Sequence, residues 1–357
     1  MFQTEIEQEL STTQEQMNAH CSVFKSLGLY PLINTLRAFG LYFIRGSHIP
    51  MKTTGQPVLR GIRADSSWSA GRIYATIMLV IMWFNAVRMC LIFDGKETLG
   101  ADLFTKVALL PGTLLVAILH TAYYVASHSG RLDQVFCQAD LSAVELFPKF
   151  CLRVKVVMVV CWIMITLNII NEVYSFMMND DNLLPLVIVN NYWMPKLCVY
   201  IIKIIVVMLN LLAVASWAFP QAMNYLVMTF LYDQFSKLSE EFSKCISDRG
   251  KFIGNFEEFR RRHQAISRSV QEADRFLMIS NVAVFCSQII NIILILYSTV
   301  FFREETMIQN AMEAVFYIVW LGFNMFALVL AAGLAIIINH AVSLWHICNI
   351  GSFTFVL

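Results

Sequence analysis

Polar and ionisable side chains interrupt several long apolar stretches of this sequence, and these residues are the ones most able to do chemistry. An ionisable group at depth in a bilayer is costly, so by default it indicates a cavity or a pathway. Aromatic walls with a few polar anchors suit a small organic ligand. We predict that a ligand site in the outer half of the membrane is lined by Asn168, Asn171, Glu172, Tyr174, Tyr200, Lys203, Tyr297, Glu313, Tyr317 and Trp320. A simpler interpretation stays open, because aromatic residues crowd membrane interfaces and charged side chains can snorkel or pair.

No pattern in the sequence is typical of an enzyme. The seven histidines are scattered, and none forms a metal-ligand pair at helical spacing with a second histidine or a carboxylate. The GxSxG, phosphate-loop and GxGxxG motifs do not occur, and the nine cysteines contain no CxxC. We therefore expect no catalytic activity, no metal and no cofactor.

The composition predicts membrane helices as the elements that position these polar residues. Hydrophobic residues make up 58% of the 357 residues and charged residues only 14%, against roughly 25% in soluble domains. A helix needs about 20 mostly apolar residues to span a bilayer. Six stretches qualify: Ile73–Phe93, Phe104–Ala126, Val156–Met177, Leu197–Leu231, Leu277–Phe302 and Met312–Asn339. The predicted fold class is all-α, a polytopic membrane helical bundle with six clear spans.

A weaker apolar stretch, Leu27–Ile44, contains Pro31 and Arg37 and is predicted to form a short or interfacial helix rather than a span. The predicted organisation has three parts: an N-terminal cytoplasmic segment over residues 1–72, a transmembrane bundle over 73–339 and a tail over 340–357.

The basic residues predict the orientation. With a cytoplasmic N-terminus, the internal segments hold twenty Lys and Arg residues, whereas the external loops hold Lys96, Lys196 and Arg303. Basic residues are retained on the cytoplasmic side, so we predict a multi-pass plasma-membrane protein with its N-terminus in the cytoplasm. This orientation argues against a G-protein-coupled receptor. The net charge of +1 gives no indication of a nucleic-acid partner.

Residues 232–276 predict a cytoplasmic helical hairpin that extends the fourth and fifth spans. Apolar residues recur there at spacings of three and four on otherwise charged helices, and Gly250 and Gly254 lie between the two runs. The apolar seam that we assign to an oligomer anchor comprises Phe235, Leu238, Phe242, Phe256, Phe259, Ile266 and Val270. Two interpretations remain: the seams pair within one chain, or they build contacts between subunits.

Two stretches carry a resemblance to a known family. "YPLINTLRAFGLYF", before the first predicted span, is similar to the N-terminal Pro…Leu-Arg…Phe-Gly-Leu stretch of the invertebrate gustatory receptors, which are related to insect odorant receptors. "FRRRHQAISRSVQEADRFLMISNVAVFCSQIINIILILYSTVFF" resembles the family's run from the last cytoplasmic loop into the fifth span. The likeness covers roughly residues 25 to 340.

The resemblance implies a chemosensory, ligand-gated cation channel with seven spans per subunit, usually a homo- or hetero-tetramer. It also implies a ligand pocket in the outer half and cytoplasmic helices that pack the subunits together. The family's seventh helix carries a Thr-Tyr…Gln-Phe motif, which "HAVSLWHICNIGSFTFVL" does not match, so no pore residue is carried over. The chain could then be a truncated product, a non-conducting relative or a subunit that needs partners.

Two other classes of function remain open. A secondary transporter would have pseudo-symmetric halves with broken helices, and no convincing internal repeat is visible. A non-conducting membrane scaffold would act through the predicted hairpin.

Overall fold

The computed structural model describes residues 28–43, 69–90, 101–138, 147–178, 196–247 and 252–301, together with short pieces between 318 and 333. Within these ranges every named element is an α-helix, and the one β-type contact is an isolated bridge between Ile246 and Phe252. The helices are α2 (Tyr30–Ala38), α3 (Ala70–Cys90), α4 (Ala101–Ser129), α5 (Arg131–Gln138), α6 (Phe147–Met178), α7 (Lys196–Lys244) and α8 (Phe256–Phe301).

Five of these helices, α3, α4, α6, α7 and α8, are long and apolar enough to cross a membrane. They contain the first five spans predicted from the sequence, except for a few terminal residues outside the described ranges. The all-helical membrane bundle is therefore confirmed for the part of the chain that the structure describes. Most of the sixth predicted span, Met312–Asn339, lies outside that part.

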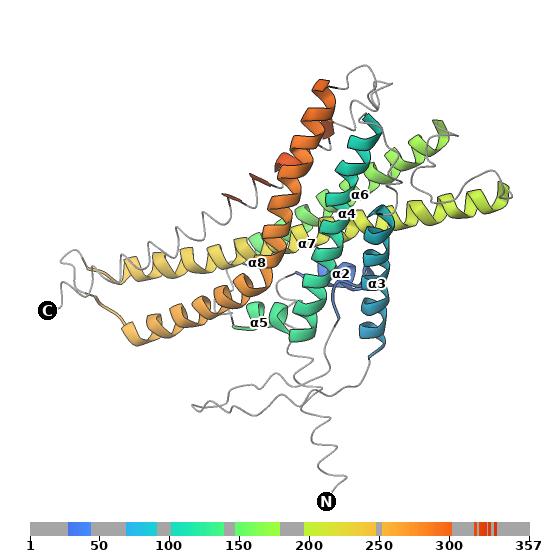
Figure 1. Cartoon of the computed structure of the whole chain (residues 1–357). Helices are drawn as coiled ribbons and strands as arrows, with labels where there is room; N and C mark the ends of the chain where they lie inside the picture. Colours follow the sequence, from blue (N-terminus) through green and yellow to red (C-terminus); the bar gives the residue numbers. More distant parts are fainter. Residues whose placement is uncertain are drawn as a thin grey trace, which may run out of the picture.

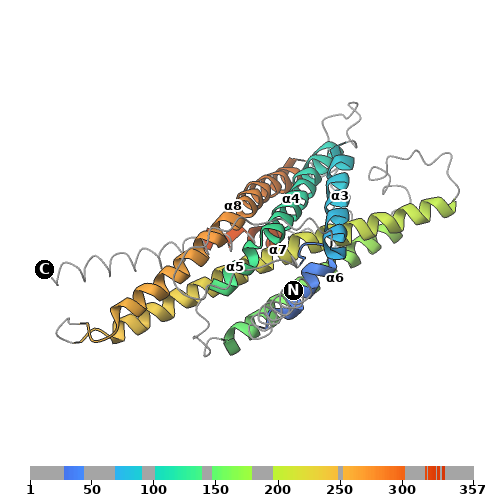
Figure 2. The same cartoon turned by 90° about the horizontal axis from the view of Figure 1, so that it is seen from below.

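The long helices pack around a continuous apolar core. Helix α4 lies against α3, α7 and α8, while α6 packs on α7 (Figures 1 and 2). Leu36, Met82, Leu119, Phe219 and Leu277, from five different helices, are all buried in this core. Outward-facing positions are also apolar, as expected for a surface that meets lipid rather than water.

Helix α2 is the short helix predicted within Leu27–Ile44, and it has one buried face and one exposed face. Its nine residues rise only about 14 Å, too little to cross a bilayer. Leu32 and Leu36 are fully buried, and Phe39, just after the helix, stacks on Phe219 of α7. Helix α2 therefore contributes to the core of the bundle, and its interfacial position stays a prediction.

Gly40 explains how α2 can end inside the bundle. Its φ of 69° follows the last helical turn, and the amides of Gly40 and Leu41 donate to the carbonyls of Arg37 and Leu36 at 3.0 and 2.8 Å. This is a Schellman ending, which satisfies carbonyls that apolar surroundings would otherwise leave unpaired. A Cβ at position 40 would lie 2.7 Å from the Met78 side chain, so glycine also allows the close approach of α3.

Pro148 lies in the first turn of a helix. In the helix just before it along the chain, Leu132 and Phe136 lie four residues apart and are both buried in α5. Pro148 is the second residue of α6, where a missing N–H is tolerated because the first-turn amides have no helical acceptor.

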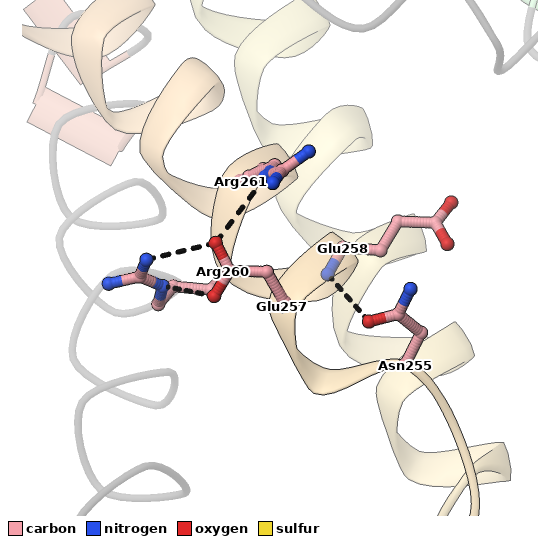
Figure 3. A network of polar contacts seen from close by, with 5 residues as sticks. All are labelled: Asn255, Glu257, Glu258, Arg260 and Arg261. Carbon is pink, nitrogen blue, oxygen red and sulfur yellow. Dashed lines mark hydrogen bonds and ion pairs between the residues drawn. The ribbon is translucent and has the colours of Figure 1, made fainter.

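Beyond the bundle, α7 and α8 run side by side and reverse at a connection near the Ile246–Phe252 bridge (Figures 1 and 2). We call this part of the chain, residues 232–276, the hairpin arm. Asn255 precedes α8, and its Oδ1 accepts a hydrogen bond from the Glu258 amide at 3.3 Å (Figure 3). Glu257 lies in the first turn and holds Arg260 and Arg261 by ion pairs at 2.8 and 3.3 Å. Capping and acidic residues at this end favour a helix that starts here.

Candidate functional site

Glu172 is the predicted ligand-site residue whose hydrogen-bond geometry the structure defines best. It lies on α6, where its Oε1 accepts a hydrogen bond of 2.9 Å from Nδ2 of Asn210 on α7. Both side chains are partly buried. An acidic group at this depth is stabilised by the amide donor, and it retains further lone pairs that could accept hydrogen bonds from a ligand.

The other predicted ligand-site residues are distributed over three helices. Asn168, Asn171 and Tyr174 are partly exposed on α6, near Glu172 along the helix. Lys203 is partly exposed on α7 and Tyr297 is exposed on α8. Tyr200 belongs to α7, but the structure does not describe its side chain; Glu313, Tyr317 and Trp320 lie outside the described residues. The structure therefore unites Glu172 with Asn210, a residue that the prediction did not include.

A second polar group, deeper in the bundle, joins α4, α7 and α8. Tyr123 Oη lies 2.9 Å from the Pro220 carbonyl oxygen and 2.7 Å from Asn224 Oδ1. The amide of Asn224 in turn donates to Ser280 Oγ at 3.0 Å. Tyr123, Asn224 and Ser280 are all buried, so these bonds replace the hydration that the side chains would otherwise have.

Pro220 gives this polar centre its position. The sequence predicts a kink in the fourth span because proline cannot donate the hydrogen bond that would reach the Ser216 carbonyl. In the structure α7 continues through Pro220, and the Tyr123 hydroxyl reaches the proline's own carbonyl. The hydroxyl thus ties α4 to the backbone of α7 at the proline, one turn beyond the Ser216 carbonyl that the proline leaves without its helical donor.

The seam of the hairpin arm is packed within the single chain. Phe235, Leu238, Phe242 and Ile266 form a small buried cluster, and Phe259 and Val270 pack against it while partly buried. Phe256, the remaining predicted seam residue, is 38% exposed near the tip of the arm. Ile246 and Ile253 are exposed at the same tip. Pairing within one chain therefore accounts for most of the seam and leaves a short apolar tip uncovered.

Two ion pairs hold the arm to itself and to the bundle. Arg262 Nη1 lies 2.6 Å from Glu241 Oε2, across the two helices of the arm. At its root, Arg153 of α6 pairs with Asp233 of α7 at 2.5 Å. Charged side chains on the outside and an apolar seam inside are the arrangement expected of helices in water.

The fold of the chain matches that of a solved structure. The structure of the insect olfactory receptor OR5 from Machilis hrabei matches with a TM-score of 0.64 over 85% of this chain and 78% of the receptor chain, at 12% sequence identity. The chain shares its fold with this receptor. No protein-family model matches the chain, and no curated protein matches its sequence.

The sequence patterns did not single out Asn210, the partner of Glu172, nor the members of the polar centre, Tyr123, Asn224 and Ser280. Asn210 and Asn224 both lie in the fourth apolar stretch and meet the same criterion of a polar side chain at depth that selected Asn168. Tyr123 resembled an interfacial tyrosine, since it lies near the end of the second predicted span. Its role became visible only when the helix packing placed it opposite Pro220.

Proposed function

We propose that the protein is a chemosensory receptor of the ligand-gated cation channel type, of the gustatory kind, and that it binds a small organic ligand in the outer half of its bundle. The observation that carries the proposal is the fold shared with an insect olfactory receptor over 85% of the chain. The gustatory assignment rests on the two sequence stretches that resemble that family. The channel mechanism is likewise what the family resemblance implies.

The Glu172–Asn210 pair is the proposed anchor for the ligand. It couples α6 to α7, so a ligand that hydrogen-bonds to Glu172 would change the contact between these two helices. A ligand can shift a conformational equilibrium only through unequal affinity for the two states. A carboxylate held between two helices is suited to this, because its surroundings change when the helices move.

We propose that the subunits assemble as a tetramer in the plasma membrane, with the N-terminus and the hairpin arm in the cytoplasm. Since the arm's seam is packed within the chain, the surface left for a neighbouring subunit is the apolar tip at Ile246, Ile253 and Phe256. The arm would then act as a rigid strut whose tip makes the contact.

The test is to express the full chain in cells, confirm its surface delivery, and record membrane current while applying a panel of sugars, amino acids, bitter compounds and odorants. An agonist-evoked cation current supports the proposal. Glu172→Gln and Asn210→Leu should raise the half-maximal agonist concentration about tenfold, since each alters a charge-assisted hydrogen bond. Thr166→Val is the matched control on α6, because among the described residues its hydroxyl bonds to its own helix, at the Trp162 carbonyl.

Two results would contradict the proposal. Substrate uptake without channel-like current would indicate a transporter. Silence towards the whole panel at normal surface expression, also on co-expression with other receptor subunits, would favour a non-conducting scaffold.

A further inference from the structure

Helix α8 carries a polar face inside an apolar segment. Between Leu277 and Phe301 the sequence has no Asp, Glu, Lys or Arg. It does place Ser280, Ser287, Gln288 and Asn291 at relative positions 0, 7, 8 and 11, which gather on one side of a helix. Ser280, Ser287 and Gln288 are buried and Asn291 is partly buried. This side of α8 is therefore turned towards protein.

The two serines on this face already have partners. Ser280 Oγ accepts a hydrogen bond from the Asn224 amide at 3.0 Å, as part of the polar centre. Ser287 Oγ donates to the Pro111 carbonyl of α4 at 3.2 Å. The polar face thus begins with contacts that tie α8 to α7 and α4.

The two amide side chains on the same face, Gln288 and Asn291, have oxygens that are unsatisfied within the described part of the chain, unlike the two serines. Gln288 Oε1 and Asn291 Oδ1 are both buried, and neither has a hydrogen-bond partner among the residues that the structure describes. Gln288 as a whole is only 1% exposed. Buried side-chain oxygens in native proteins are almost always satisfied, so two unsatisfied ones less than a turn apart need a donor. Inside a membrane bundle, bulk water does not supply it.

We propose that Gln288 and Asn291 form a binding site for the hydroxyl or N–H group of a small uncharged ligand. An uncharged donor fits because both unsatisfied atoms are amide oxygens and the segment carries no charge. A cationic ligand would instead favour a carboxylate such as Glu172, which lies on α6. The site shares with the proposed function only the premise of a small organic ligand, and its occupancy does not require conduction.

The experiment uses the full chain in lipid nanodiscs and measures thermal unfolding with increasing 1-hexanol. Methyl pentyl ether is the matched probe, because it is an isomer of hexanol that accepts hydrogen bonds but donates none. The test variant is Gln288→Met combined with Asn291→Leu, which keeps the side-chain size and removes both oxygens. Cys286→Ala is the control variant, since Cys286 is exposed on the same helix.

The wild-type protein and the Cys286→Ala control should be stabilised more by hexanol than by the ether. The double variant should bind hexanol about tenfold more weakly, as expected for the loss of the hydrogen bond that the hydroxyl donates to the amide oxygens. Without ligand, the double variant should unfold at the same or a higher temperature, because it no longer buries two unsatisfied oxygens.

Two results would overturn the inference. In the first, hexanol and methyl pentyl ether change the unfolding temperature equally in the wild type, the control and the double variant. In the second, the double variant unfolds at a clearly lower temperature without ligand, which means that water or another part of the chain already satisfies the two oxygens. A silent receptor that still shows the hexanol difference would contradict the proposed function and leave this site in place.

Discussion

The two halves of the α7–α8 pair have opposite polarity. In the hairpin arm, Phe235 and Phe242 are buried between the helices, whereas Arg260 and Arg261 are exposed. In the bundle, the same helices expose Ile205 and Ile293 and bury Asn224 and Ser280. One continuous pair of helices thus changes from an apolar interior with a charged surface to a surface rich in aliphatic side chains with polar groups inside.

The reversal follows from what surrounds each half. In water, burial of apolar surface drives packing, so an apolar seam holds the arm together. Lipid is as apolar as leucine, so helices in a bilayer gain little from such burial and are joined by close packing and interhelical hydrogen bonds. The arm and the bundle should therefore respond differently to equivalent substitutions.

Removal of a seam side chain from the arm should have the largest effect. Phe242→Ala should destabilise the arm by about 3–5 kcal/mol, because it leaves a cavity in a small apolar cluster. Hydrogen exchange of the arm amides and thermal unfolding would measure the loss. Ser236→Ala, at an exposed site of the arm outside the seam and the tip, should change stability by less than about 0.5 kcal/mol. Equal effects at the two positions would contradict a seam that is packed within one chain.

A charged residue on the outer surface should have the second-largest effect, and the effect should differ between the bundle and the arm. Ile293→Lys, at a 59% exposed position of α8 in the bundle, should cost about 2.5–3.5 kcal/mol if that surface faces lipid. Ser236→Lys, at an exposed position of the arm away from its tip, should be nearly neutral. Unfolding in nanodiscs and the yield of membrane-inserted protein would compare them. A harmless lysine at position 293 would mean that this surface faces water.

The polar centre should show a smaller effect. Tyr123→Phe removes the hydroxyl that lies against the Pro220 carbonyl and Asn224, and should cost about 1–2 kcal/mol. A double-mutant cycle with Asn224→Leu, followed by thermal unfolding, would isolate the interaction between the two side chains. Additive effects would show that the hydroxyl does not act through Asn224, which leaves its contact with the Pro220 carbonyl and its packing.

The ion pair across the arm should have the smallest effect. Arg262→Gln should cost about 0.2–1 kcal/mol, because the pair with Glu241 is partly solvated, and the loss should shrink as salt is added. Unfolding at low and high ionic strength would measure it, with the exposed Arg268→Gln as the control. A loss that is independent of salt would mean that Arg262 acts through its aliphatic packing.

Much of the fold was predictable because each helix follows a local rule. The first five apolar runs needed only their length and composition, since a bilayer requires about 20 apolar residues whatever their partners are. The arm was predictable from its spacing of three and four, which places Phe235, Leu238 and Phe242 on one face. The candidate site was predicted less well, since a polar residue in a span shows its depth but not the helix that it faces.

The sequence by itself therefore determined the helices and the charged arm, because each of these depends on residues that are neighbours along the chain. The tertiary structure decided which polar groups meet: Glu172 with Asn210, Tyr123 with Pro220, and Ser280 with Asn224. It also decided that α2 enters the bundle, through a close contact between Gly40 and Met78. The partners in these contacts are separated by 38 to 97 positions in the chain, so no local pattern could reveal them.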